Sequence, residues 1–272
     1  MLIKVSVASI PPITLTTMRL WLAAALLITY LKLCGDTLPK DKVSWFVFCV
    51  IGLVGNSLPF CLINYGEVYI DSALAAILMG IMPVATILLA HLFIPEEPFT
   101  PTRITGVALS FSGLLILVGW DALSGIGSAV IAQLAVLAGA LSYSVSAVFA
   151  RRNAKLPGRI ISAGATLMGA IWVTPVALIT ENPWTLEPST QSLLAMVLLA
   201  IFPTAIGALI FFKLIKAIGA NGLAQVNYLI PILGLGWGVL LLGEQPSWRA
   251  GIALVCILAG VILVNKTSAK SN

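Results

Sequence analysis

Charge is scarce in this chain. Of its 272 residues, 9% are charged and 60% are hydrophobic, whereas a soluble domain carries about 25% charged residues. The acidic residues stand at or near breaks between the apolar runs. The composition therefore excludes a water-soluble globule of this length. The runs are continuous and do not alternate in segments of about ten residues, which argues against a membrane β-barrel and predicts an all-α polytopic membrane protein.

The residue types that most catalytic and metal sites need are also rare. There is one histidine, His91, and the four cysteines have no CxxC spacing, so we expect no metal, no cofactor and no disulfide framework. An intramembrane enzyme would need an interior carboxylate cluster, a Ser/His pair or a metal site, and the sequence offers none of these. Neither a Walker motif nor a mid-helix carboxylate relay is present. His91 remains open as a proton site, beside an interfacial or packing role.

The formal net charge of +5 raises the question of a nucleic-acid partner. Basic residues in cytoplasmic loops explain it better, and the partners expected are the lipid bilayer and a small-molecule substrate, with the oligomeric state open. If the loop at residues 32–42 is cytoplasmic, strict alternation puts most basic residues on that side. They are Lys32, Lys40, Lys42, Arg103, Arg151, Arg152, Lys155, Arg159, Lys213, Lys216, Lys266 and Lys270. We therefore expect a bacterial inner-membrane protein with a cytoplasmic C-terminus.

Nine apolar segments are predicted to cross the membrane, whose hydrocarbon core takes about 20 helical residues. They follow a short N-terminal segment, residues 1–9, that cannot cross by itself. The predicted crossings are Pro12–Leu33, Val43–Gly66, Ser72–Phe93, Thr102–Trp120, Ala129–Arg151, Ile160–Thr180, Ser189–Phe212, Ala220–Leu242 and Arg249–Val264.

Two of these segments share a skeleton. "PVATILLAHLFIPEEP" begins at Pro83 and "PILGLGWGVLLLGEQP" begins at Pro231, and both read Pro, twelve residues, Glu, one residue, Pro at an offset of 148. Alternation makes the two segments run in opposite directions across the membrane. The pattern therefore predicts an inverted repeat of two five-helix units, the plan of many secondary transporters. Pro83 and Pro231 are candidate kink or gating residues, a plain structural kink being the alternative.

The repeat sets the expected domain boundaries. Residues 1–120 form the first unit, 127–266 the second and 267–272 a short cytoplasmic tail. Pro11 matches Pro157 at an offset of 146, so the helix that begins near Ala129 would correspond to one that begins before Met1. We therefore expect the first helix of a ten-helix bundle to be truncated in this chain.

Four stretches carry a family resemblance. They are "PPITLTTMRLWLAAALL", "NYGEVYIDSALAAILMGIMPVATILLAHLFIPEEP", "VLAGALSYSVSAVFARR" and "KAIGANGLAQVNYLIPILGLGWGVLLLGEQPSWRAGIALVCILAGVILV". The chain resembles the EamA family of the drug/metabolite transporter superfamily. The resemblance implies ten helices in two inverted halves, cytoplasmic termini and the movement of small metabolites, often amino acids. Tyr143 stands where the family often has a tryptophan.

Polar residues inside three segments suggest where a substrate is bound, because such residues usually face the protein interior. Their spacing places each group close to one helix face. The candidate substrate-binding residues are Asn56, Asn64, Gln133, Tyr143, Ser144, Asn221, Gln225 and Tyr228. Interhelical hydrogen bonding is the alternative role for each of them. Uncharged amides and hydroxyls suit a zwitterionic or polar neutral solute.

Two further features are left with alternatives. Arg19 lies seven residues inside the predicted helix start at Pro12, and it either snorkels outward or pairs with a carbonyl or a substrate carboxylate. Tyr65, Glu67 and Asp71 read most simply as solvated loop ends. Together these observations favour a secondary transporter of small polar metabolites, an exporter working by alternating access. A non-transporting membrane scaffold or assembly protein is the alternative.

Overall fold

The computed structural model describes residues 2–95, 100–118, 126, 129–153, 155–226, 228–229 and 248–268, and its regular structure there is helical throughout. Pro231, Glu96 and Glu244 lie outside these residues. The elements are α1 (Leu2–Ser6), α2 (Pro12–Leu33), α3 (Lys42–Gly52), η1 (Leu53–Ser57), α4 (Leu58–Tyr69), α5 (Ser72–Met79), α6 (Met82–Phe93), α7 (Pro101–Val118), α8 (Val130–Asn153), α9 (Gly158–Thr180), η3 (Pro183–Thr185), α10 (Thr190–Leu199), η4 (Ala200–Ile206), α11 (Gly207–Ala224) and α13 (Trp248–Ser268).

Six helical stretches in the described part of the chain are long and apolar enough to cross a membrane. They are Pro12–Leu33, Lys42–Tyr69, Leu74–Phe93, Val130–Asn153, Gly158–Thr180 and Thr190–Ala224. Two shorter apolar helices span Pro101–Leu117 and Gly251–Val264. Eight of the nine predicted crossings lie largely within one of these stretches, and the ninth, Ala220–Leu242, lies mostly outside the described residues. The chain is an all-helical polytopic membrane protein.

A glycine ends one of the long stretches. Gly219 has φ 74° and ψ 179° inside the apparent span of α11. Side chains with a Cβ rarely adopt this conformation, whereas glycine does so at little cost. The chain therefore changes direction at Gly219, one residue before the predicted start of the crossing at Ala220.

Two π-helical segments, η1 and η4, interrupt other crossings at matching places. Ser57 in η1 donates a 3.0 Å hydrogen bond to the carbonyl of Gly52, and Thr204 in η4 donates one of 2.7 Å to the carbonyl of Leu199. A π segment inserts a residue into the α-helical ladder and leaves carbonyls that need other donors. The hydroxyls of Ser57 and Thr204 supply those donors, each to the carbonyl five residues earlier in the chain. Ser57 and Thr204 are 147 positions apart, and so are the two accepting residues, Gly52 and Leu199.

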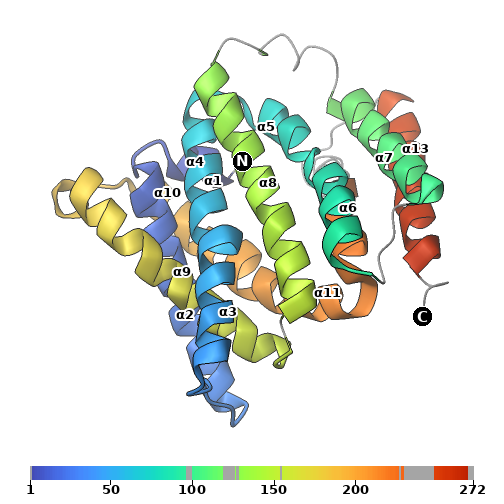
Figure 1. Cartoon of the computed structure of the whole chain (residues 1–272). Helices are drawn as coiled ribbons and strands as arrows, with labels where there is room; N and C mark the ends of the chain where they lie inside the picture. Colours follow the sequence, from blue (N-terminus) through green and yellow to red (C-terminus); the bar gives the residue numbers. More distant parts are fainter. Residues whose placement is uncertain are drawn as a thin grey trace.

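The helices α7 and α13 pack side by side at one edge of the molecule (Figure 1). A Cβ on Gly106, near the start of α7, would meet Gly260 and Val264 late in α13, whereas one on Gly113 would meet Ala253 and Ile257 earlier in α13. The two helices therefore run antiparallel. Their glycines let the backbones approach closely, as small residues do in membrane helix pairs.

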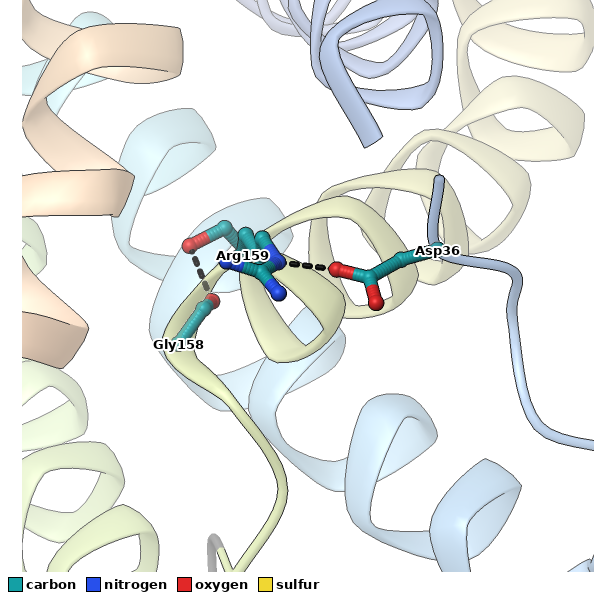
Figure 2. A network of polar contacts seen from close by, with 4 residues as sticks. Asp36, Gly158 and Arg159 are labelled. Carbon is teal, nitrogen blue, oxygen red and sulfur yellow. Dashed lines mark hydrogen bonds and ion pairs between the residues drawn. The ribbon is translucent and has the colours of Figure 1, made fainter. Parts of the chain in front are cut away.

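Side chains from α8, α9 and α11 tie neighbouring segments together at one end of the bundle. Arg159 at the start of α9 forms an ion pair with Asp36, which follows α2, and Figure 2 shows the two side chains turned toward each other. Lys216 of α11 donates a 2.6 Å hydrogen bond to the carbonyl of Leu156, and Arg151 of α8 donates one of 3.2 Å to the carbonyl of Lys216. These contacts gather basic residues predicted for a single side of the membrane.

The other end of the bundle is tied by carboxylates. Glu181 accepts hydrogen bonds of 3.1 and 2.6 Å from the backbone N–H groups of Ile13 and Thr14, so it caps α2 from the end of α9. Glu67 is 7% exposed and accepts a 2.9 Å bond from the Ser72 hydroxyl. The interpretation of Glu67 as a solvated loop end was therefore wrong. Its carboxylate is buried because it joins the end of α4 to the start of α5.

Candidate functional site

A buried cation lies between helices from distant parts of the sequence. Arg19 of α2 is 5% exposed, and its Nε donates a 2.6 Å hydrogen bond to Oγ1 of Thr204 in η4. The sequence left open whether Arg19 snorkels outward, and the structure excludes that alternative. The N-terminus of α2, which carries Arg19, is well capped. Pro12 has no N–H at a position where none is needed, and Glu181 accepts hydrogen bonds from the N–H groups of Ile13 and Thr14.

Two aromatic rings pack next to this cation. The guanidinium carbon of Arg19 lies 3.9 Å from the ring centroid of Phe60 in α4, within cation–π range. Phe60 in turn packs edge-on against Tyr143 of α8, with 6.2 Å between the ring centroids. Four elements, α2, α4, α8 and η4, thus converge on one charged group. We refer to Arg19, Phe60, Tyr143 and Thr204 as the arginine cluster.

Asn64 extends this cluster toward the start of α2. It is fully buried, and its Nδ2 donates to Oγ1 of Thr16 at 3.0 Å and to the carbonyl of Pro12 at 3.3 Å. Thr16 and Arg19 are three residues apart and therefore neighbours on the surface of α2. Oδ1 of Asn64 has no hydrogen-bond donor among the described residues. Asn56, in η1, is half-buried and packs beside Gly169 of α9.

The remaining candidates on α8 have different neighbours. Ser144 is fully buried and donates to the carbonyl of Met82 at 3.0 Å, which ties α8 to α6. Gln133 lies near the start of α8 and is 7% exposed. Pro83 is the second residue of α6, just after the turn at Gly80 and Ile81 that separates α5 from α6. Ser144 and Pro83 thus lie at a break in the third predicted crossing.

The candidates after Gly219 form a second group. Tyr228 is fully buried, and its hydroxyl donates a 2.9 Å hydrogen bond to the carbonyl of Gly80. Its ring packs with Leu114 of α7 and Ile257 of α13, away from the arginine cluster. Asn221 is fully buried. Gln225 is 1% exposed, and its side-chain amide has no hydrogen-bond partner among the described residues. Pro231, the last candidate, lies outside the described part.

Sequence reasoning expected one set of amides and tyrosines on three helices. The structure joins Asn64 and Tyr143 to the arginine cluster and gives Ser144 and Tyr228 contacts to the α5–α6 break. It adds Phe60, Thr16 and Thr204, which the sequence did not single out. The sequence offered one indication that such residues exist, namely Arg19, because a charged residue inside an apolar helix needs partners nearby.

The described residues hold no cluster of three or more His, Cys, Asp or Glu side chains that could bind a metal ion. The arginine cluster instead brings one positive charge, two aromatic rings and one threonine hydroxyl together between four elements. One positive charge, hydroxyls and amides can orient a small polar solute.

Helical membrane proteins with polar groups between their spans include many transporters, and the comparisons identify the family. The model of the EamA-like transporter family matches residues 1–119 and 130–266. This chain belongs to the EamA-like transporter family. The resemblance noted in the sequence is confirmed, and the protein is a membrane transporter rather than an enzyme.

Two relatives and one solved structure illustrate the similarity. The chain is 26% identical over 81% of its length to a "Probable terminal-alkyne amino-acid exporter" of Streptantibioticus cattleyicolor, 73% of which is covered. It is 25% identical over 96% of its length to an "Uncharacterized inner membrane transporter YedA" of Escherichia coli K12, 84% of which is covered. A crystal structure with 24% identity shares the fold, with a TM-score of 0.78 over 97% of this chain and 91% of the other.

Proposed function

We propose that the protein is a secondary transporter that exports small polar metabolites, amino acids or related compounds, by alternating access between two inverted repeats. The observation that carries this proposal is contact between matching residues. Ser110 of α7 donates a 3.3 Å hydrogen bond to the carbonyl of Ile257 in α13, 147 positions later. Gly113 and Gly260 stand at the same separation. A residue can touch its own counterpart only where the axis relating two repeats passes between them.

The direction of the paired helices supports inversion. Two equivalent helices related by a twofold axis that crosses between them perpendicular to their length must run antiparallel, as α7 and α13 do. Such an axis in the membrane plane exchanges the two faces of the bilayer, which is the geometry of inverted-topology transporters. The matching π segments η1 and η4, with their hydroxyl bonds at an offset of 147, support the same repeat in units 1–120 and 127–266.

The loop contacts support the proposed orientation. The residues that meet at the Asp36–Arg159 end come from loops to which strict alternation gives most of the basic side chains. The positive-inside rule makes that end cytoplasmic. If successive crossings alternate in direction across the membrane, the C-terminus also lies on the cytoplasmic side. The "inner membrane" in the name of the Escherichia coli relative is consistent with a bacterial inner-membrane location.

Two observations favour an amino acid as the exported substrate. The relative from Streptantibioticus cattleyicolor is named as an amino-acid exporter, and the arginine cluster offers one positive charge among uncharged polar groups. A multiply charged solute such as a phosphate ester would meet too few basic groups here.

Proteoliposome counterflow tests the function. Vesicles containing the purified full chain are loaded with one L-amino acid at a time and supplied with a trace of the radiolabelled compound outside. We expect uptake of label for at least one compound with an uncharged side chain, above protein-free vesicles. Efflux from cells that overproduce the chain then tests direction. Absence of counterflow for every amino acid and related small metabolite would support the scaffold alternative instead.

A further inference from the structure

We propose that Arg19 binds the carboxylate of the transported solute, so that the substrate class is narrowed to small molecules with a free carboxylate. This inference rests on the proposed transport function and deepens it. The charge on Arg19 is not balanced by a neighbouring acidic side chain in the described part of the chain. Arg19 is 5% exposed, and no carboxylate among the described residues lies within 4 Å of its guanidinium.

A buried positive charge without a negative partner is costly, because the low-dielectric interior replaces the water that would solvate it. The described surroundings compensate it in part. Thr204 accepts one hydrogen bond, and the face of Phe60 supplies a cation–π contact. Neither group carries a negative charge. An anion from outside the chain would therefore gain more at this place than at an exposed arginine.

The geometry leaves the right donors available. A guanidinium has five N–H groups, and the hydrogen bond to Thr204 occupies the single one on Nε. The four N–H groups on the two Nη atoms donate to none of the described residues. Two of them point in parallel from the end of the guanidinium, which matches the two oxygens of a carboxylate. The bond from Nε and the ring of Phe60 fix the orientation of this fork before a ligand arrives.

The position of the cluster connects it to transport. Arg19 is carried by α2 and Thr204 by η4, whereas Phe60 and Tyr143 are carried by α4 and α8. The residues thus come from both of the proposed repeats. A carboxylate held by Arg19 would contact helices that must move relative to each other during alternating access. Differential contacts of this kind are what allow a substrate to bias a conformational equilibrium.

Matched ligands test the inference without altering the protein. The purified full chain in detergent is heated while its tryptophan fluorescence is recorded, in the presence of L-amino acids with uncharged side chains or their α-carboxamides. A ligand that binds only the folded state raises the unfolding midpoint. We expect at least one amino acid to raise it and the corresponding carboxamide to leave it unchanged. Equal shifts from both members of every pair, or no shift from any acid, would overturn the assignment.

Three variants then identify the group responsible. Arg19→Gln should abolish the shift, and Arg19→Lys should weaken the apparent Kd at least about tenfold, since a lysine offers no planar fork. Arg152→Gln, which removes an exposed arginine from α8, is the matched control and should leave the shift intact. Without ligand, Arg19→Gln should unfold no earlier than the unaltered chain because it removes a buried charge that Thr204 and Phe60 compensate only in part. A lower midpoint with the ligand shift retained would assign Arg19 to structure alone.

Counterflow separates this inference from the proposed function. If an amino acid exchanges across vesicles with the same KM in Arg19→Gln as in the unaltered chain, the transport proposal stands and the carboxylate site is wrong. If the acid stabilises the chain through Arg19 in detergent yet never crosses the vesicle membrane, the site stands and the transport proposal is wrong.

Discussion

The hydroxyl of Tyr228 donates a 2.9 Å hydrogen bond to the backbone carbonyl of Gly80, and the two residues are 148 positions apart. That separation equals the distance in sequence between Pro83 and Pro231. Gly80 lies in the break between α5 and α6, and Tyr228 follows the turn at Gly219. A polar bond thus holds matching positions of the proposed repeats together in the apolar interior, beside the α7–α13 pair.

Replacing Tyr228 with phenylalanine should destabilise the protein. The change keeps the ring and removes the donor, so the buried carbonyl of Gly80 loses its partner, which typically costs about 1–3 kcal/mol. Thermal unfolding in detergent should show a lower midpoint for Tyr228→Phe. Tyr69→Phe is the control, because the Tyr69 side chain is 60% exposed. Equal midpoints for the Tyr228 variant and the unaltered chain would show that the bond adds nothing to stability.

Ser57 and Thr204 provide a matched pair for the arginine cluster. Each hydroxyl donates to the carbonyl of the residue just before its π segment, Gly52 or Leu199. Thr204 alone accepts the bond from Arg19, whereas Ser57 also donates to the carbonyl of Gly169. Thr204→Val should weaken binding of a carboxylate by about threefold to tenfold, as loss of one net hydrogen bond predicts. Ser57→Ala should leave the Kd unchanged. Titration of the thermal shift against ligand concentration measures both, and equal effects of the two variants would argue against a specific role of Thr204.

The glycine contact between α7 and α13 predicts a position-dependent effect of alanine. A Cβ on Gly106 would lie 2.7 Å from the carbonyl oxygen of Gly260, whereas one on Gly251 would meet nothing within 4 Å. Gly106→Ala should therefore lower stability by about 1–3 kcal/mol through overpacking. Gly251→Ala should be neutral or slightly stabilising, since alanine favours helix. Chemical unfolding of the two variants side by side distinguishes these outcomes, and a stable Gly106→Ala protein would contradict the packing.

Asp41 predicts a small dependence of stability on pH. The backbone N–H of Ser44 donates a 2.8 Å bond to its carboxylate at the start of α3, and this lowers the pKa of Asp41 below its ordinary value. A lowered folded-state pKa gives stability that is present above the unfolded pKa of about 3.9 and is lost as pH falls through the folded-state pKa. Asp41→Asn should remove this contribution. Unfolding midpoints recorded from neutral to acid pH test it, and parallel curves would refute it.

Much of the fold could be predicted from the composition and from the apolar runs in the sequence. Continuous apolar runs located the crossings, because the length of a lipid-spanning helix is fixed by the bilayer. Helix interruptions were less visible. Pro203 lies inside η4 and Pro59 follows η1, yet a proline alone does not reveal whether the backbone responds with a kink or a π segment. The hydrogen bonds from Ser57 and Thr204 decide that, and they depend on three-dimensional positions.

The candidate site could be predicted from the sequence only in part. Asn64 and Tyr143 were expected from their polarity inside apolar helices, and both belong to or adjoin the arginine cluster. Phe60 looked like any other apolar residue, since nothing along the chain tells which ring faces a charge. Arg19 was conspicuous, but its direction was open, because an arginine this close to a helix start can reach the interface or turn inward.

The amino-acid sequence was enough to identify an integral membrane protein, to locate most of its helices and to indicate its family. Those properties follow from hydrophobicity, length and motif, which are local along the chain. The burial of Arg19 against Phe60 and Thr204, and the bond from Tyr228 to Gly80, could be seen only in the folded chain. Such contacts join residues 41 to 185 positions apart, and their partners are chosen by how helices pack in three dimensions.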